Sequence, residues 1–414
     1  VLVDPCLNPD GHDRFVHFVE QRSTSPLNPE PAEWSHVEPW PGGRVNHYLF
    51  DLNRAWAWAR QPETQARLAM YNAWLPHVHG DFHEMGYNSP YYFAPAAAPY
   101  HELITPWQRR FQELVGEAAA ADFDARGERY FTREDFDLFY PSYGDTYPIF
   151  RGAIGMTYEQ GGGPRSAAAV RLENGKVLDL AHRVKNHVHS SFALLDVCAG
   201  QIPTLLAESD AYFARSRAGA PGAFGAYILP ADQPQLAELL PFLDQHGIAY
   251  GHAPAPKKAM PGYDYLQAER RPVTWNAGDW IIPANQPHGG LLQALMDPQP
   301  VLEDSLTYDI TAWALPYAYG IACYGVETPL EIERAPLNPE ASGDLAPSVY
   351  GCAVVPNTAA ARAFIARCSE AGLTGRLLTK PSSLNGHDLP TGTVVFLQDD
   401  QTLAQWTEAL NAVS

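Results

Sequence analysis

The second half of the chain repeats one pattern four times, and this repetition constrains the fold more than any other feature of the sequence. Each copy is a short apolar run that follows a glycine, ends at Pro or Leu, and precedes a residue able to cap a helix. The copies occupy residues 225–232, 278–285, 351–358 and 392–399. Helix-period segments follow at least three of them, for example residues 235–247 and 360–372. Continuous apolar strands that alternate with helices predict one small α/β domain with a mostly parallel sheet.

A second, larger domain is expected before these repeats. Residues 1–215 are rich in Trp, Tyr, His and Pro and contain two predicted helices, at 62–74 and 106–121. A stretch rich in Gly, Pro and Ala at 216–225 is typical of a linker. The chain of 414 residues is therefore predicted to be an α/β protein with domains at 1–215 and 226–414.

Composition excludes some classes of protein. The 28 Lys and Arg residues are outnumbered by 47 Asp and Glu residues, and the resulting net charge of −19 argues against binding to nucleic acid. Five widely spaced cysteines form no Cys-x-x-Cys pair, so no zinc ribbon is expected, while one or two disulfides stay open. Residues 310–326 carry no charge but contain Pro316 and Gly320 and fall short of the ~20 residues that a spanning helix needs. We expect a buried loop and strand there and no membrane span.

The chain begins with Val1, and residues 1–11 are interpreted as a buried strand that runs into a turn. Because a domain seldom opens within a strand, we expect an N-terminal segment to be absent from this sequence. Localisation then rests on a part that is not seen.

A strand-like segment at 74–86 holds the first candidate site. In an extended conformation, His77, His79, Asp81 and His83 would share one face, which suits a metal or acid/base site. The alternative is a polar strand end with satisfied histidines. The aromatic residues at 87–95 would follow this segment and could form a wall of a substrate cleft.

Two other segments add chemistry to this candidate. Asn53 and Arg54 set an amide beside a guanidinium, a pair that can hold a carboxylate. Glu159 ends an apolar strand before a glycine turn and is a candidate general base. His182 and His187 are five residues apart rather than four, so these histidines and His189 are interpreted as ordinary polar residues of a helix.

The order of these segments resembles the zinc carboxypeptidases of the carboxypeptidase A-like family. The resemblance covers about residues 1–200, and a bacterial branch is indicated by residues 83–86, 89–95 and 159–162. It is carried by Asn-Pro-Asp-Gly at 8–11, Asp-Leu-Asn-Arg at 51–54, Asp-Phe-His-Glu-Met-Gly at 81–86 and Tyr-Glu-Gln-Gly at 158–161. It implies a carboxypeptidase-like mixed sheet with flanking helices; the second domain is reminiscent of amidotransferase-like or flavodoxin-like folds.

The resemblance also implies a role for each site residue. His83 would be the third ligand of a catalytic zinc, and Glu159 would be the general base. Asn53 and Arg54 would hold the terminal carboxylate of a peptide substrate. An arginine after the turn at 8–11, Arg14, would polarise the scissile carbonyl. The family's tyrosine over the site would be Tyr143, with Tyr140 and Tyr147 as competitors.

The sequence departs from the family at the other two zinc ligands. A His-x-x-Glu pair is expected upstream of residues 8–11, hence upstream of Val1, whereas His17 and Glu20 fit the spacing but follow the turn. As written, the chain is expected to bind zinc poorly. Two functions are therefore predicted: a metallocarboxypeptidase that depends on an upstream segment, or a catalytically inactive module that binds peptide carboxylates. A secreted or periplasmic location is favoured over a cytoplasmic one, and the oligomeric state stays open.

Overall fold

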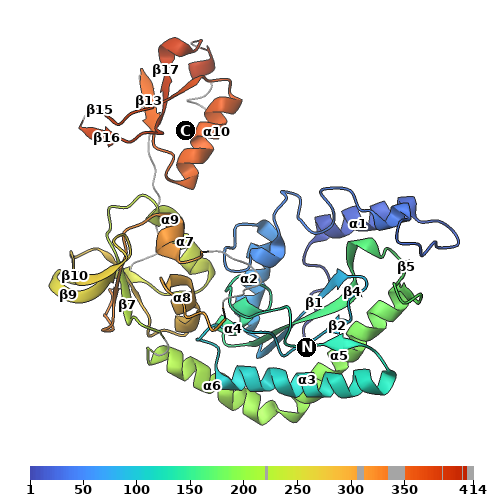
Figure 1. Cartoon of the computed structure of the whole chain (residues 1–414). Helices are drawn as coiled ribbons and strands as arrows, with labels where there is room; N and C mark the ends of the chain where they lie inside the picture. The colour runs from blue at the N-terminus through green and yellow to red at the C-terminus, as the bar shows by residue number, and fades with distance from the viewer. Residues whose placement is uncertain (220–221, 305–311, 334–349, 385, 403, 408–414) are drawn as a thin grey trace.

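The first half of the chain is built on a four-stranded mixed sheet, with its two long strands side by side (Figure 1). The computed structural model describes residues 1–219, 222–304, 312–333, 350–384, 386–402 and 404–407. The strand order is β1-β4-β2-β3, so β1 is an edge strand. β1 (Val78–Gly86) runs parallel to β4 (Ile154–Gly162), whereas β2 (Tyr91–Tyr92) is antiparallel to β4 and parallel to β3 (Tyr130–Phe131).

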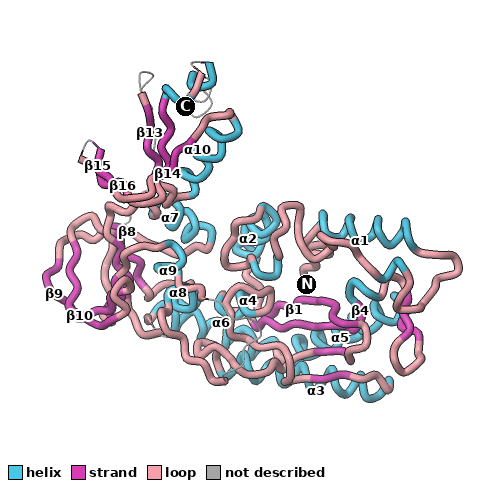
Figure 2. Tube along the Cα trace, turned by 45° about the horizontal axis from the view of Figure 1, so that its top comes forward, coloured by secondary structure: helices cyan, strands magenta, loops and turns pink. Residues whose placement is uncertain are grey.

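Two long helices cover one face of this sheet. α3 (Pro106–Arg126) and α5 (Leu180–Gly200) pack on each other and on β4, and Figure 2 shows both beneath β1 and β4. The helix predicted at 62–74 is confirmed as α2 (Pro62–Trp74). α3 begins where predicted but continues past residue 121, because its stop signal is Gly127, whose φ of 68° is left-handed. The first half also contains α4 (Thr146–Phe150), α6 (Ile202–Arg217), and the hairpin of β5 (Ala169–Arg171) and β6 (Val177–Asp179).

The N-terminal residues are not the buried strand that we predicted. Val1 and Val3 are 96% and 76% exposed, and α1 (Pro9–Arg22) begins inside the predicted turn. Asn8 caps this helix, since its Oδ1 accepts a hydrogen bond from the Gly11 amide at 3.0 Å, and Pro9 occupies the first helical turn. The same residue types favour both a turn and a helix start, and here the helix forms.

The second half contains a six-stranded sheet in the order β10-β9-β12-β7-β11-β8. Its strand pairs are antiparallel, so the predicted parallel sheet is wrong. A continuous apolar run indicates a strand covered on both faces, and it does not distinguish strand direction. The strands are β7 (Ala226–Leu229), β8 (Gly251–His252), β9 (Lys257–Asp264), β10 (Glu269–Trp275), β11 (Trp280–Pro283) and β12 (Tyr324–Val326); the helices are α7 (Leu236–Gln245), α8 (Gly289–Met296) and α9 (Leu315–Tyr319).

The last two apolar runs form a different sheet from the first two. β13 (Gly351–Val354) and β14 (Gly375–Leu377) both pair antiparallel with β17 (Val394–Leu397), and α10 (Ala359–Glu370) follows β13. β15 (Ser382–Leu384) and β16 (His387–Leu389) form a hairpin. All four predicted strands therefore exist, but they are divided between two antiparallel sheets. The chain is a mixed α/β protein with several sheets.

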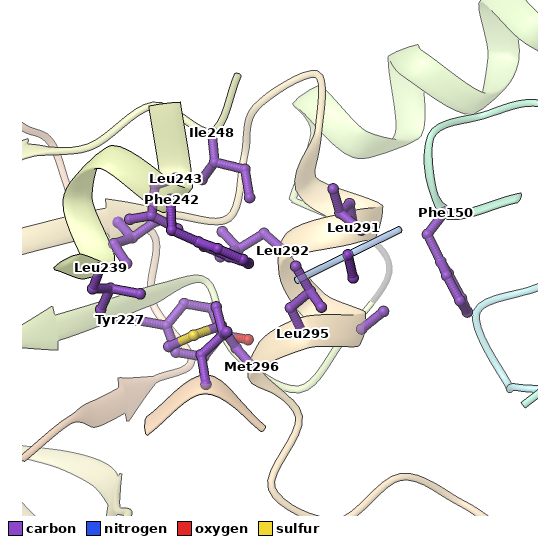
Figure 3. Packing of buried hydrophobic residues seen from close by; sticks show 14 of the residues in the cluster. Phe150, Tyr227, Leu239, Phe242, Leu243, Ile248, Leu291, Leu292, Leu295 and Met296 are labelled. Atoms are coloured by element: carbon purple, nitrogen blue, oxygen red, sulfur yellow. The ribbon is translucent and has the colours of Figure 1, made fainter. Parts of the chain in front are cut away.

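One hydrophobic core joins the first and second halves of the chain. Figure 3 shows α8, with Leu291 and Leu292, between Phe150 on one side and Phe242 of α7 on the other. The same cluster contains Trp56 from the first half. The core that these segments share also includes Tyr71, Tyr147, Tyr227, Leu239, Leu243, Leu295 and Met296.

Both ends of the stretch at 216–225 contact ordered elements of the structure. Ser216 and Arg217 belong to α6, Phe224 is buried, and the Gly225 amide donates to the Val326 carbonyl at 2.8 Å. Of residues 310–326, the first two lie outside the described residues, and the remainder contains α9 and β12. Within the described part of the chain, no single helix is long and apolar enough to cross a membrane. α5 and α6 reach that length and apolarity only together, with a bend of 79° between them.

Candidate functional site

One face of β1 carries the side chains that the sequence predicts for a metal or acid/base site. His79, Asp81 and His83 alternate along the strand and therefore share a face. His77 precedes the strand, and its carbonyl oxygen accepts a hydrogen bond from the Ile154 amide at 2.9 Å. The predicted extended conformation is confirmed.

The register between β1 and β4 places His83 directly beside Glu159. The two residues are Cα partners in the parallel pair, although they are far apart in the sequence. β4 passes so close to the backbone of Asp145 that position 155 must be glycine, because a Cβ there would lie 1.8 Å from the Asp145 carbonyl oxygen. The fold thus brings the predicted metal ligand and the predicted general base together.

His83 and Asp81 form a buried ion pair, with 2.6 Å between Nε2 and Oδ2. Burial alone would lower the pKa of His83, but the charges of Asp81 and Glu159 outweigh it and raise the pKa to about 9. Burial pushes the pKa of Asp81 upward, and the nearby His83 charge reverses this and leaves that pKa below its usual value. At neutral pH, His83 is therefore an imidazolium held by Asp81.

Two other carboxyl groups, Glu159 and Asp145, lie close to this pair. Burial raises the pKa of each to about 7, and the negative charge of Asp81 adds to the increase. Thr157 Oγ1 donates to Asp145 at 2.9 Å, whereas Glu159 Oε2 is buried with no hydrogen-bond partner among the described residues. Glu159 therefore exchanges its proton near neutral pH, which is what a general base requires.

Asn53 lies on a short 3-10 helix that places its amide against His83. The helix, η2 (Leu52–Arg54), is capped by Asp51, whose carboxylate accepts a hydrogen bond from the backbone nitrogen of Asn53 at 2.9 Å. The side-chain Oδ1 of Asn53 accepts from the Gly144 amide at 2.8 Å, which fixes the orientation of the side chain. Its Nδ2 consequently faces His83, 3.4 Å from Nε2.

Arg54 lies next to Asn53 and contacts the predicted tyrosine. Its guanidinium carbon is 4.5 Å from the centre of the Tyr143 ring, and its Nη1 donates to the Asn53 carbonyl at 3.2 Å. The hydroxyl of Tyr140 contacts a tryptophan and that of Tyr147 a histidine. Tyr143 is thus the one of the three tyrosines that stacks on Arg54.

The arginine that acts on Glu159 is Arg44, which the sequence analysis missed, and not Arg14. The Arg14 side chain on α1 donates to the backbone carbonyls of residues 42, 45 and 46 and does not line the cleft. Arg44 lines the cleft, forms an ion pair with Asp51 at 2.9 Å, and lowers the pKa of Glu159. The available signal was the position of Arg44 in a glycine turn shortly before residues 51–54.

A cleft of about 960 Å³ opens along the edge strand β1. Asn53, Asp81 and His83 form part of its wall, whereas Arg54, Tyr143 and Glu159 are not among its lining residues. The N-terminal segment and apolar side chains of α2 and α5 form much of the remainder. The lining includes Arg44, Asn53, Arg67, Met70, Trp74, His79, Asp81, Phe82, His83, Leu194 and Leu195. Such a mixture of apolar surface and a few convergent polar groups is typical of ligand sites.

The aromatic segment at 87–95 is core and not a wall of this cleft, which corrects our expectation. Tyr91, Tyr92 and Phe93 are 0–2% exposed, because β2 lies between β4 and β3 and is covered on both faces. Tyr91 and Phe93 pack with Phe123 of α3.

The other histidines noted in the sequence have structural partners. His182 and His189 of α5 lie 3.2 and 3.1 Å from carboxylates, and His187 Nδ1 is 2.8 Å from a tyrosine hydroxyl. Burial lowers the pKa of His187 to about 4. His17 and Glu20 lie on exposed α1 with 3.9 Å between their charged groups. None of these residues lines the cleft, although the His187 ring packs against Phe82, which does.

The described residues fit a catalytic zinc only in part. His83 supplies an imidazole, and Glu159 supplies a carboxyl group that is free to move a proton. A catalytic zinc needs three protein ligands, and no group of three His, Cys, Asp or Glu in the described ranges is arranged to hold a metal ion. His83 would also have to give up its proton and its contact with Asp81 to bind one.

The comparisons with known proteins add no relative. No family model matches the chain, and searches of curated proteins and of solved structures found no match. The interpretation of the site therefore rests on its own residues.

Proposed function

We propose that this chain carries the substrate-binding and proton-transfer residues of a zinc-dependent metallocarboxypeptidase. The reaction would be hydrolysis of peptide, or cell-wall peptide, amide bonds near a free carboxylate. One observation carries the proposal: His83 pairs with Glu159 across two strands while Asn53 contacts His83. These residues come from three separate segments, each of which the resemblance to zinc carboxypeptidases selects. The mixed strand directions of the first sheet are compatible with a carboxypeptidase-like fold.

The chain's own residues divide the work as follows. Arg54 and Asn53 hold the substrate carboxylate, because a guanidinium and an amide offer several donors to two carboxylate oxygens. Glu159, with a pKa near 7, takes a proton from the attacking water and returns it to the leaving amine. Arg44 takes over the carbonyl-polarising role that the resemblance gave to Arg14. His83 would be the zinc ligand from this chain, and no further ligand is identified among the described residues.

A second function is favoured by a different observation. His83 is paired with Asp81, and the clamp of Asn53 and Arg54 is oriented by hydrogen bonds to the Gly144 amide and the Asn53 carbonyl. This arrangement suits a catalytically inactive module that binds the free carboxylate of a peptide. In that case, Glu159 would serve no proton transfer, and its raised pKa would be a cost of burial.

Replacement of Glu159 by Gln in the protein as isolated from its source separates the two functions. For an enzyme, release of the C-terminal residue from a test peptide should fall by about 10²–10⁴-fold. Zinc content and peptide affinity should stay close to those of the unchanged protein. Equal turnover by the variant would remove Glu159 from its role. Unchanged protein that binds free-carboxylate peptides, contains no zinc and cleaves nothing would support the binding module.

A further inference from the structure

We infer that His246, from the second half of the chain, is a positioning residue for the carboxylate clamp formed by Asn53 and Arg54. The inference rests on the proposed function, and it gives the six-stranded sheet region a role that its sequence does not announce. His246 follows α7 directly and is fully buried. Its ring is hydrogen-bonded to the loop that carries the clamp.

Both ring nitrogens of His246 have partners from the first half. Nε2 lies 2.7 Å from the Ala57 carbonyl oxygen, and Nδ1 lies 2.8 Å from the Tyr147 hydroxyl. A carbonyl oxygen only accepts, so Nε2 carries the proton and Nδ1 accepts from the tyrosine. Burial lowers the pKa of His246 to about 3, which keeps the ring in this neutral form. The ring thus bridges α4 and residues 53–57, which carry the clamp and are called the clamp loop below.

A short chain of hydrogen bonds connects Ala57 with the clamp. The Ala57 amide donates to Ser142 Oγ at 2.9 Å, and the same hydroxyl donates to the Arg54 carbonyl at 3.0 Å. On the other side, the Gly144 amide donates to the Asn53 side chain. Residues 53–57 are therefore held on one flank by the loop at 142–144 and on the other by His246.

His246 is itself fixed by contacts that do not involve the clamp loop. Arg151 donates to the His246 carbonyl oxygen and, at 2.6 Å, to Asn72 Oδ1. Asn72 Nδ2 donates to the Gln245 carbonyl at 2.8 Å. The Phe242 ring packs 4.6 Å from the imidazole centre. His246 is thus held in place by contacts with Arg151 and Phe242, and its neighbour Gln245 is held by Asn72.

Loss of the imidazole would leave a buried carbonyl without a donor on the clamp loop. Ala57 is 0% exposed, so water cannot replace the lost partner unless the loop moves. Movement of residues 53–57 would displace Asn53 and Arg54, and a displacement of about 1 Å at such a site can cost roughly 10²-fold. A positioning residue should therefore affect carboxylate recognition more than it affects the remaining contacts with the peptide.

Three variants of the full chain test this inference. His246→Phe keeps the ring volume and removes both hydrogen bonds, whereas His246→Gln keeps a donor that can reach the Ala57 carbonyl. Leu239→Ala is the control, since Leu239 is a fully buried residue of α7 that makes no hydrogen bond to the clamp loop. Two quantities are measured: the ratio of affinities for a free-carboxylate peptide and its C-terminal amide, and hydrogen–deuterium exchange of residues 53–57.

We expect His246→Phe to reduce the affinity ratio by about ten-fold and to speed exchange of the loop, consistent with the loss of a buried hydrogen bond. His246→Gln should restore most of both. Leu239→Ala destabilises the shared core but should leave the affinity ratio unchanged. An unchanged ratio and unchanged exchange in His246→Phe would overturn the inference. The same changes in Leu239→Ala would also overturn it, because they would reflect general destabilisation. If the unchanged chain does not distinguish the two peptides, the proposed function fails, and the exchange data alone decide whether His246 holds the loop.

Discussion

Replacement of Phe150 by Ala tests whether the first sheet and the six-stranded sheet form one cooperative unit. Phe150 ends α4, is 1% exposed, and belongs to the cluster that also contains Leu291 of α8 (Figure 3). A buried aromatic side chain removes roughly 150–250 Å² from water, which at about 25 cal/mol per Å² corresponds to about 4–6 kcal/mol. Alanine retains part of that contact, so the expected loss is about 3–5 kcal/mol, the usual range for Phe→Ala in a core.

The assay is hydrogen–deuterium exchange at increasing urea concentration. Peptides from β1 and β4 report the first sheet, and peptides from β7 and β11 report the second. If one core holds both sheets, Phe150→Ala should lower the unfolding free energy of all four strands by the same amount. The control is Phe396→Ala, because Phe396 of β17 lies in a separate cluster with Cys368, Leu373 and Trp406. That variant should destabilise β13 and β17 and leave β1 and β4 unchanged.

A result in which Phe150→Ala destabilises only β1 and β4 would refute the reasoning. The contacts across α8 would then be too weak to couple the sheets. The proposed action of His246 on the clamp loop would lose its rigid support as well. A loss below about 1 kcal/mol would show that the site repacks and that Phe150 fills no essential volume.

Two further predictions concern the cleft. Arg54→Ala should weaken binding of peptides with a free C-terminal carboxylate by ten-fold or more and leave binding of amidated peptides nearly unchanged. Arg60→Ala, at a more exposed arginine, is the control. Equal losses of affinity for both peptides would show that the clamp is misassigned. Glu159→Gln should stabilise the fold at high pH. The pKa of Glu159 is raised from 4.5 to about 7, so the folded state favours the protonated form and loses about 2.5 × 1.36, or roughly 3 kcal/mol, as the pH rises through 7. Urea unfolding at pH 4.5 and 8.5 measures this, with the exposed Glu117→Gln as control, and a pH-independent difference between Glu159→Gln and the unchanged chain would contradict it.

Local patterns predicted several elements well, and their limits have a physical cause. α2 was predicted to its ends because Pro62 favours the first turn of a helix and the Glu63 carboxylate suits the helix dipole there. The strands at 226–229 and 394–397 were found because an apolar run needs cover on both faces. The direction of 226–229 was missed, since it depends on how the chain returns through α7 and the β9–β10 hairpin, and no residue within a strand encodes that return. The direction of 394–397 depends in the same way on its pairing with β13 and β14.

The site shows the same division between local and long-range information. His83 and Glu159 could be selected from the sequence because each has distinctive neighbours. Each lies inside its strand, not at the strand end that we expected, and their pairing follows from the β1–β4 register. Arg44 was missed and Arg14 was selected, since only the packing of α1 shows that the Arg14 guanidinium is occupied by backbone carbonyls. The role of His246 depends on a contact across 189 residues, which no local pattern reveals.

The charges in the cleft explain why its occupant and its chemistry are linked. Asp81, Asp145 and Glu159 lie close together, and the nearby cations are His83, Arg44 and Arg67. With Asp81 ionised, the other two carboxyl groups keep their protons up to about pH 7 because they are buried and close to its negative charge. Any cationic group that entered the cleft would lower the pKa of Glu159 and turn it from a proton holder into a base. If Glu159 is the general base that we propose, its proton-accepting strength would therefore depend on the charge of the ligand beside it.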